Sequence, residues 1–165
     1  MSVRWKPAAT VAAIIEQDGR FLLVEEATPE GIRWNQPAGH LEPGESLADA
    51  VCREVLEESA HVFAPQGLLG VYLAPGAHET YLRFAFVGSV GAALDRPLDT
   101  PIVRAFWADA ETMLAHPERM RSPLVMACIN DYRRARAEGT PWLPLQAVHY
   151  VPADPVRCQP TTGHH

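Results

Sequence analysis

Residues 39–60 read GHLEPGESLADAVCREVLEESA, and the rest of the chain is organised around this stretch. The pair Pro43-Gly44 indicates a turn. Ser46 is suited to the N-cap of a helix, with Asp49 three residues later in the capping-box position. The apolar residues that follow recur at helical spacing and predict a stripe packed on a core; they are Ala48, Val51, Cys52 and Val55.

The same helix carries three glutamates on a second face. Glu54, Glu57 and Glu58 are spaced i, i+3, i+4, so their side chains converge on one turn. Crowded carboxylates repel one another, and a hard divalent cation, which prefers oxygen ligands, relieves that repulsion best. The spacing therefore predicts a metal site, although a solvated acidic helix face has the same pattern.

Further fixed positions extend this pattern beyond the acidic cluster. Gly39 is followed after five residues by Glu45, and after seven more by the string REVLEE at 53–58. The combination resembles the Nudix box, the signature of the Nudix hydrolase superfamily. The resemblance implies an α/β fold, the Nudix α/β/α sandwich with a mixed β-sheet between helices. It also implies Mg²⁺ as the cofactor, with Mn²⁺ as a substitute, bound by Gly39 through its carbonyl and by Glu54, Glu57 and Glu58.

The resemblance implies different catalytic roles along the box. We expect Glu58 to take the proton of the attacking water, with Glu57 or an acidic loop residue as the alternatives. Glu45 and Arg53 are expected to form an ion pair that fixes the loop against the helix, while a surface charge is the alternative for Arg53. Ala60 stands where the family usually has Gly, so we expect the helix to end differently or to run on by a residue or two.

Sequence outside the box resembles the NudJ-type phosphatase subgroup. The matching strings are WKP at 5–7, RWNQPAGHLE at 33–42, LRFAFV at 82–87 and RSPLV at 121–125. This resemblance implies release of phosphate from nucleoside di- and triphosphates or from pyrimidine and thiamine pyrophosphates. Two alternatives stay open: a Nudix pyrophosphohydrolase of another specificity, for oxidised nucleotides or nucleotide sugars, and a non-catalytic module that senses a nucleotide.

Candidate substrate-binding residues also lie outside the box. Trp34 could stack on a heterocyclic base, but a core position is an equal alternative. Arg83 lies within an apolar strand, where a charge needs a reason, although a solvated sheet face would explain it equally well. The candidate phosphate partners are Arg4, Lys6, Arg33 and Arg83, and His40 within the box loop is a further one.

Length and composition fit one globular domain. The chain has 165 residues, 47% hydrophobic and 21% charged, which predicts a single Nudix domain over 1–150 and an irregular tail over 151–165. A net charge of −6 argues against nucleic-acid binding through a basic surface. No apolar run approaches the roughly 20 residues that span a bilayer, and the first residues lack a signal-peptide core. We therefore expect a cytoplasmic protein without a membrane partner, acting on a small molecule as a monomer or homodimer.

Turn signals and apolar runs predict the elements on either side of the box. The expected strands are 10–15, 20–24, 32–36, 68–74, 81–87 and 102–107. Gln17-Asp18-Gly19 predicts a hairpin turn, and Glu25-Glu26 is expected in a loop. Asp109 should cap a short helix, and Ser122-Pro123 should open a long one that ends before Gly139. From Pro141 onward, frequent proline predicts irregular structure.

Overall fold

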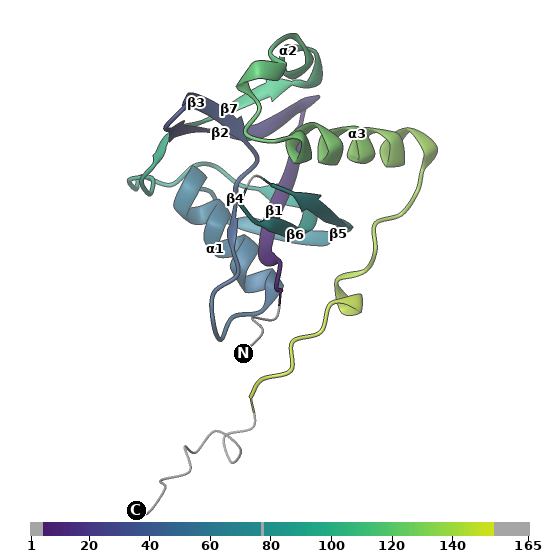
Figure 1. Ribbon diagram of the computed structural model, residues 1–165. Coiled ribbons are helices and arrows are strands. Elements are labelled where there is room, and N and C mark those ends of the chain that lie inside the picture. Colours follow the sequence, from purple (N-terminus) through teal and green to yellow (C-terminus); the bar gives the residue numbers. More distant parts are fainter. Residues whose placement is uncertain (1–4, 77, 154–165) are drawn as a thin grey trace, which may run out of the picture.

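A mixed β-sheet forms the middle layer of the computed structural model, which describes residues 5–76 and 78–153 (Figure 1). The strands are β1 (Ala8–Gln17), β2 (Arg20–Thr28), β3 (Gly31–Asn35), β4 (Ala38–His40), β5 (Phe63–Pro75), β6 (Thr80–Val90) and β7 (Ile102–Asp109). The helices are α1 (Leu47–Ser59), α2 (Ala110–Ala115) and α3 (Pro123–Glu138), with 3-10 turns η1 (Pro117–Arg119) and η2 (Leu145–Ala147). The sheet has the order β3-β2-β1-β6-β5, with β4 paired to β1 and β7 paired to β2. Strands β1 and β6 are parallel, whereas the other pairings are antiparallel.

Helices α1 and α3 cover opposite faces of this sheet. Neighbouring residues on β6 point to different layers: Phe86 belongs to the core under α1, and Val87 to the core under α3. Val51 and Val55 fill the first layer from α1, and Ile129 fills the second from α3. This arrangement confirms the α/β/α sandwich that the sequence predicted.

The hairpin between β1 and β2 closes as its residue types require. Asp18 and Gly19 take positive φ angles of 53° and 77°, the left-handed conformation of a two-residue turn of type I′. The Gly19 N–H donates to Glu16 Oε1 at 2.7 Å. The predicted turn is therefore confirmed, and it brings Glu16 opposite Phe21.

Two predicted boundaries around the sheet were wrong. Strand β2 continues through Glu25 and Glu26 to Thr28, where a loop was expected, because this stretch pairs with β3 on one side and β7 on the other. Strand β5 begins at Phe63 and not near Leu68. The short strand β4 was not predicted; it forms because residues 38–40 pair with β1.

Helix α1 begins after the N-cap that the sequence predicted, Ser46. The Asp49 N–H donates to Ser46 Oγ at 3.1 Å, and the Ser46 hydroxyl donates to Asp49 Oδ2 at 2.6 Å. The predicted caps at Asp109 and Ser122 also precede α2 and α3, and Gly139 follows α3 with a positive φ of 67°.

The expectation for the end of α1 was wrong. Ala60 itself takes the left-handed conformation, with φ 59° and ψ 22°, and its N–H donates to the Leu56 carbonyl at 3.0 Å. The helix thus ends at Ser59, in the way that a glycine would end it, and does not run on. Alanine pays the steric cost of a positive φ at this position.

Residues 141–150 are less irregular than the sequence predicted. The Trp142 ring stacks on Tyr132 of α3, with centroids 5.2 Å apart and planes 14° apart. Leu143 exchanges backbone hydrogen bonds with Leu68 of β5. The Tyr150 hydroxyl donates to the Gly44 carbonyl at 3.1 Å, so this segment returns to the loop before α1. Residues 154–165 lie outside the described part of the chain.

Within residues 5–76 and 78–153, no helix combines the length and the apolar character needed to cross a bilayer.

Candidate active site

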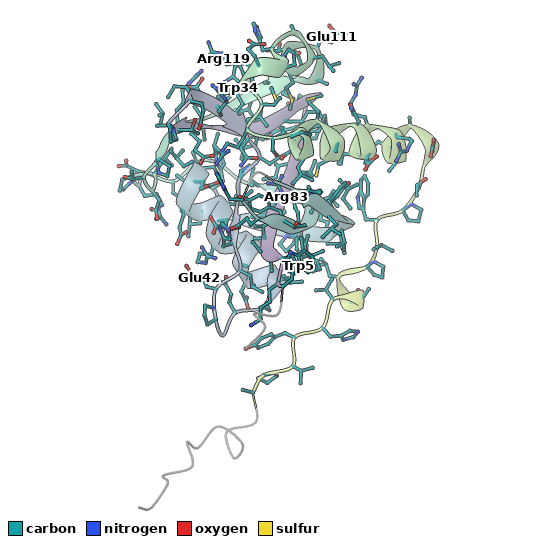
Figure 2. All side chains as sticks on the ribbon, in the orientation of Figure 1. Trp5, Trp34, Glu42, Arg83, Glu111 and Arg119 are labelled. Atoms are coloured by element: carbon teal, nitrogen blue, oxygen red, sulfur yellow. The ribbon has the colours of Figure 1, made fainter. Side chains whose placement is uncertain are left out.

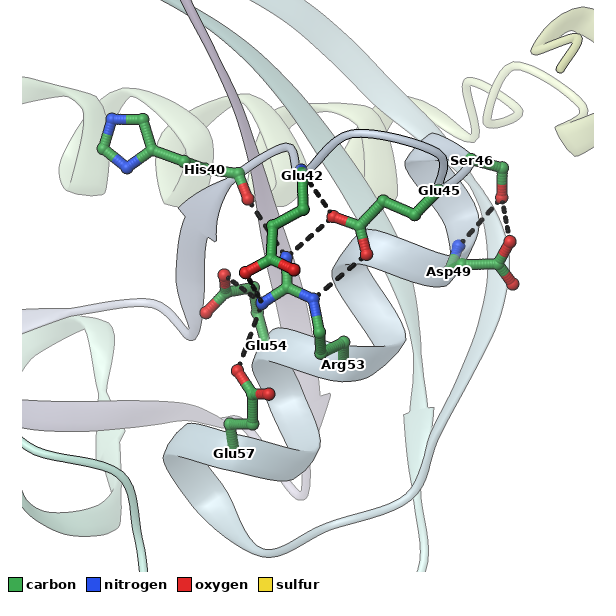
Figure 3. Close-up of polar contacts among 8 residues, drawn as sticks. All are labelled: His40, Glu42, Glu45, Ser46, Asp49, Arg53, Glu54 and Glu57. Carbon is green, nitrogen blue, oxygen red and sulfur yellow. Dashed lines mark hydrogen bonds and ion pairs between the residues drawn. The ribbon is translucent and has the colours of Figure 1, made fainter. Parts of the chain in front are cut away.

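Arg53 holds the loop before α1 onto the helix (Figure 3). Its guanidinium clamps the Glu45 carboxylate at two points, Nε to Oε2 at 3.0 Å and Nη2 to Oε1 at 2.8 Å. Nη2 also donates to the His40 carbonyl at 3.1 Å. The hydrogen bonds from Arg53 lower the pKa of Glu45, and those to Glu45 raise the pKa of Arg53. The predicted pair of Glu45 and Arg53 therefore ties the loop, β4 and α1 together.

The same guanidinium reaches the acidic face of the helix. Nη1 donates to Glu54 Oε1 at 2.8 Å and to Glu57 Oε2 at 3.1 Å. Figure 3 shows both carboxylates turned toward Arg53. Among the described residues, no set of three His, Cys, Asp or Glu side chains is arranged as a ready metal site.

Glu58 has a different hydrogen-bond partner from Glu54 and Glu57. Its Oε2 accepts the backbone N–H of Ala38 in β4 at 2.9 Å. Burial raises the pKa of Glu58 to about 8, and the charges of Glu54, Glu26 and Glu57 push it the same way against the Ala38 hydrogen bond. The residue therefore lies between the acidic helix face and the sheet.

Gly39 gives Glu54 its position. A methyl group at Gly39 would overlap the Glu54 carboxylate, so the side chain lies where only a glycine leaves room. Glu54 is 9% exposed, and burial raises its pKa, with Arg53 opposing and Glu57 and Glu45 adding to the rise. The predicted metal residues Gly39 and Glu54 are in direct contact.

The donor set suits a divalent cation. Glu54, Glu57 and Glu58 supply carboxylate oxygens from adjacent turns of one helix, beside the backbone of β4, and hard cations bind such oxygens. Burial is the main cause of the raised pKa values of Glu54 and Glu58, and neighbouring carboxylates add to the rise. A bound cation would favour the charged form of these carboxylates.

A cavity of about 200 Å³ opens beside Glu58. It lies where β1, β4 and β6 meet the end of β3 and the start of α3, and its walls include Thr10, Asn35, Gly39, Glu58, Tyr81 and Arg83. A larger cavity, of about 740 Å³, lies between the β1–β2 hairpin and α3 and includes none of the box residues. The smaller cavity is therefore the one that adjoins the acidic cluster.

Arg83 is buried in this cavity wall at the middle of the molecule (Figure 2). It is 7% exposed, so the solvated sheet face that could have explained it is excluded. Nη1 donates to Gln36 Oε1 at 3.4 Å, Nε has no partner, and burial lowers the pKa of the guanidinium. No described carboxylate forms an ion pair with it.

Trp34 is a core residue, which corrects its assignment to substrate stacking. It is 8% exposed, its Nε1–H donates to Glu25 Oε1 at 3.2 Å, and its ring meets the rings of Phe106 and His116 edge-on. Figure 2 shows it near Arg119, whose guanidinium lies 5.9 Å from the ring centroid, and away from Arg83. The ring is therefore packed into the protein and is not free to stack on a ligand.

The remaining predicted phosphate partners lie in different places. Lys6 is exposed ahead of β1, and Arg33 donates to the Ile32 carbonyl at 3.2 Å; neither lines the cavity. His40 does line it, with Nε2 3.9 Å from Glu79 Oε2. Arg4 lies outside the described residues.

Sequence reasoning missed several polar residues of the cavity, among them Thr10 and Asn35. Thr10 pairs with Arg83 across the parallel β1 and β6 and with His40 across β1 and β4. The available signal was a lone hydroxyl at the start of the otherwise apolar run TVAAII. Asn35 carried no such signal, because it stands among other polar residues.

Comparisons with known proteins agree with this geometry. The NUDIX domain family matches residues 5–127. Phosphatase NudJ of Escherichia coli (strain K12) is 37% identical over 131 residues, which cover 78% of this chain and 85% of that protein. A solved NUDIX hydrolase from Nitrosomonas europaea is 50% identical, with a TM-score of 0.82, and the match covers 88% of this chain and 98% of that one. The MutT protein of Methanosarcina mazei Go1 is 25% identical with a TM-score of 0.66, covering 85% and 100%.

These matches account for the box, the sandwich and the position of the acidic helix together. The family match spans most of the described chain and includes every residue of the Arg53 cluster. Enzymes of this family generally use divalent metal ions. The chain belongs to the NUDIX domain family and is a Nudix hydrolase that acts on phosphorus-containing acid anhydrides.

Proposed function

We propose that this hydrolase uses Mg²⁺ to release phosphate from nucleoside di- and triphosphates or from pyrimidine and thiamine pyrophosphates. One observation carries the proposal: a buried arginine without a carboxylate ion-pair partner lies in a cavity that one box glutamate, Glu58, borders. Arg83 is 7% exposed and shares that cavity with Glu58. An uncompensated cation at such a depth favours an anionic ligand. The NudJ resemblance favours this substrate class over oxidised nucleotides and nucleotide sugars.

Glu54, Glu57, Glu58 and the carbonyl of Gly39 would hold the metal ion, Mg²⁺ or in its place Mn²⁺. When bound, the ion would neutralise the phosphate charge and orient the attacking water. The chain contributes the frame, because Arg53 fixes Glu54, Glu57 and the loop relative to one another.

Glu58 is our choice as the acceptor of the proton from the attacking water. It borders the cavity, and the Ala38 N–H fixes one of its carboxylate oxygens. Glu57 is the alternative, and its carboxylate is engaged by Arg53 at 3.1 Å. A carboxylate that is oriented by the backbone can take a proton without losing its own position.

A phosphate-release assay with product identification tests the proposal. We expect orthophosphate from nucleoside triphosphates or hydroxymethylpyrimidine pyrophosphate with Mg²⁺ present, and none after chelation. Glu58→Gln should lower kcat by about 10²- to 10⁴-fold, the usual contribution of a general base, while far-ultraviolet circular dichroism stays unchanged. Glu138→Gln, at the exposed end of α3, is the matched control.

Other products would replace the proposal with a defined alternative. Pyrophosphate or two monophosphates would indicate a Nudix pyrophosphohydrolase of another specificity. Binding without turnover of any anhydride would indicate a nucleotide-sensing module. The single-domain extent over 1–150, the cytoplasmic location and the monomeric or homodimeric state stay predictions from the sequence.

A further inference from the structure

The segment that follows α3 turns back past β5 and ends at the loop before α1 (Figure 1). We call residues 140–150 the C-terminal strap. The family match ends at residue 127, so the strap lies beyond the part of the chain that the NUDIX domain covers. What the strap does therefore has to be inferred from its own contacts.

The first residues of the strap are anchored to α3 and β5. Trp142 stacks on Tyr132 of α3. Leu143 exchanges two backbone hydrogen bonds with Leu68 of β5, at 2.8 and 3.0 Å. The strap approaches β5 so closely that a methyl group at Gly67 would lie 2.6 Å from Trp142 Cβ. The strap thus leaves β5 from a fixed position.

The middle of the strap packs beside the start of α1. Leu145 and Val148 contact the core layer under α1, which includes Phe86. A cavity of about 150 Å³ lies between the strap and the first turn of the helix, where Leu47 forms part of its wall. The strap therefore follows the end of α1 that joins the loop.

The last residue of the strap reaches the box loop, residues 41–46. The Tyr150 hydroxyl donates to the Gly44 carbonyl at 3.1 Å. Gly44 has a φ of 86°, a conformation that glycine adopts without strain. The next residue, Glu45, is the one that Arg53 clamps at 2.8 and 3.0 Å. The strap and the helix thus hold adjacent residues of the same loop.

Few other contacts fix this loop from outside. Among the described residues, the side chains that bond to residues 42–45 from beyond the loop are Arg53 and Tyr150. The other hydrogen bonds of residues 42–45 are internal to the loop. The position of the loop therefore depends on one contact from the helix and one from the strap.

We propose that the C-terminal strap is a positioning element of the hydrolase, in which Tyr150 holds the box loop in reach of Arg53. A loop that moves away takes Glu45 from Arg53. A less fixed guanidinium then orients Glu54 and Glu57 less well, because both accept hydrogen bonds from it. Since the metal role of these glutamates is the proposed function, the inference rests on it. Loss of the Tyr150 contact should weaken metal binding more than it slows the metal-saturated enzyme.

Limited proteolysis with a glutamate-specific protease measures the position of the loop directly. Mass spectrometry identifies cleavage after Glu42 or Glu45, which requires the loop to leave its place. We expect Tyr150→Phe and Tyr150→Ala to raise this cleavage rate about 3- to 10-fold, the effect of one hydrogen bond. Cleavage after Glu30, in the exposed turn before β3, is the internal reference. Val151→Ala, at a position 84% exposed just after the strap, is the matched control and should be cleaved like the natural chain.

The Mg²⁺ dependence of hydrolysis gives a second measurement, which a general loss of stability would not change. The Mg²⁺ concentration for half-maximal rate should rise about 3- to 10-fold in Tyr150→Phe, with a smaller change in kcat at saturating Mg²⁺. Calorimetry of Mg²⁺ binding to the full chain without substrate should show the same shift.

The proposal is wrong if Tyr150→Phe leaves either the loop cleavage or the Mg²⁺ requirement unchanged, even where Tyr150→Ala changes it, because the hydroxyl would then have no role. It is also wrong if Val151→Ala behaves alike, or if cleavage after Glu30 rises by the same factor, since the whole chain would then be less stable. Proteolysis needs no turnover. A chain that hydrolyses no anhydride would therefore count against the proposed function alone, and loop cleavage would decide the role of the strap.

Discussion

The Glu54 carboxylate lies directly against the α-carbon of Gly39, so that a single methyl group at position 39 would occupy the same space. This contact joins β4, which sequence analysis did not foresee as a strand, to the acidic face of α1. The glycine of the box is therefore required by the position of a glutamate side chain as well as by any role of its own carbonyl.

Gly39→Ala should displace Glu54 and remove most of the hydrolase activity. Forcing a methyl group into this contact should also lower the free energy of unfolding by about 1–3 kcal/mol, as overpacking of closed sites does. Urea unfolding and initial rates of phosphate release check both expectations. Gly91→Ala is the matched control, since nothing lies within 4 Å of a methyl group there. Equal stability and equal activity of the two variants would show that the contact between Gly39 and Glu54 does not limit the size of residue 39.

Arg53→Lys tests whether the shape of the guanidinium matters beyond its charge. Lysine keeps the positive charge but cannot clamp Glu45 at two points while also reaching Glu54 and Glu57. We expect a loss of about 1–2 kcal/mol in the free energy of unfolding, about one charged hydrogen bond, and a lower affinity for the metal ion by calorimetry.

Arg134→Lys is the comparison for that variant, because Arg134 forms an exposed pair with Asp131 on α3. It should change neither the stability nor the metal affinity. If Arg53→Lys binds the metal ion as tightly as the natural chain does, then positive charge alone is enough to organise the box.

The sequence predicts features that local patterns decide. The cap at Ser46, the stripe through Val51 and Val55, and the Asp18-Gly19 turn each follow from a few neighbouring residues. The extension of β2 was missed because Glu25-Glu26 is polar, and polar residues in a strand are stabilised by partners far away in the chain.

In the candidate site, too, local patterns could be predicted, whereas contacts between distant segments could not. The pair of Glu45 and Arg53 could be predicted from the box, but the contact of Arg53 with Glu54 and Glu57 depends on which rotamers the loop permits. Thr10 and Asn35 become part of a cavity only when strands distant in sequence come together. Burial of Trp34 likewise follows from tertiary packing.

The partly buried Glu25 carboxylate should make stability depend on acid pH. Arg104 donates to it at 2.7 and 2.9 Å, which lowers the pKa of Glu25, with Trp34 assisting. A lowered folded-state pKa adds stability above the unfolded value of about 4.3, and this stability is lost as pH falls through the folded value. Since Arg104 is 56% exposed, the contribution should be only about 1 kcal/mol.

Glu25→Gln measures that contribution. The difference in free energy of unfolding between the natural chain and this variant should be constant above about pH 5. It should shrink as the pH falls below about 4. Glu30→Gln, at an exposed position before β3, should show no gap at any pH. A gap that stays the same size as pH falls below about 4 would assign the effect to packing around Trp34 and not to charge.

Ala60 offers a test of backbone strain at the end of α1. Ala60→Gly relieves the positive φ, which should raise the free energy of unfolding by about 1–2 kcal/mol. Loss of the buried methyl group should lower it by about 0.8 kcal/mol, and the added freedom of the unfolded chain should lower it further, by about 0.4–1 kcal/mol. These effects nearly cancel, so Ala60→Gly should lie within about 1 kcal/mol of the natural chain. Ala60→Val should lose about 2 kcal/mol or more, because a β-branched residue tolerates the left-handed region poorly. Chemical denaturation of both variants decides the matter: equal stability of the valine and glycine variants would mean that the helix has an alternative end, as the sequence had suggested.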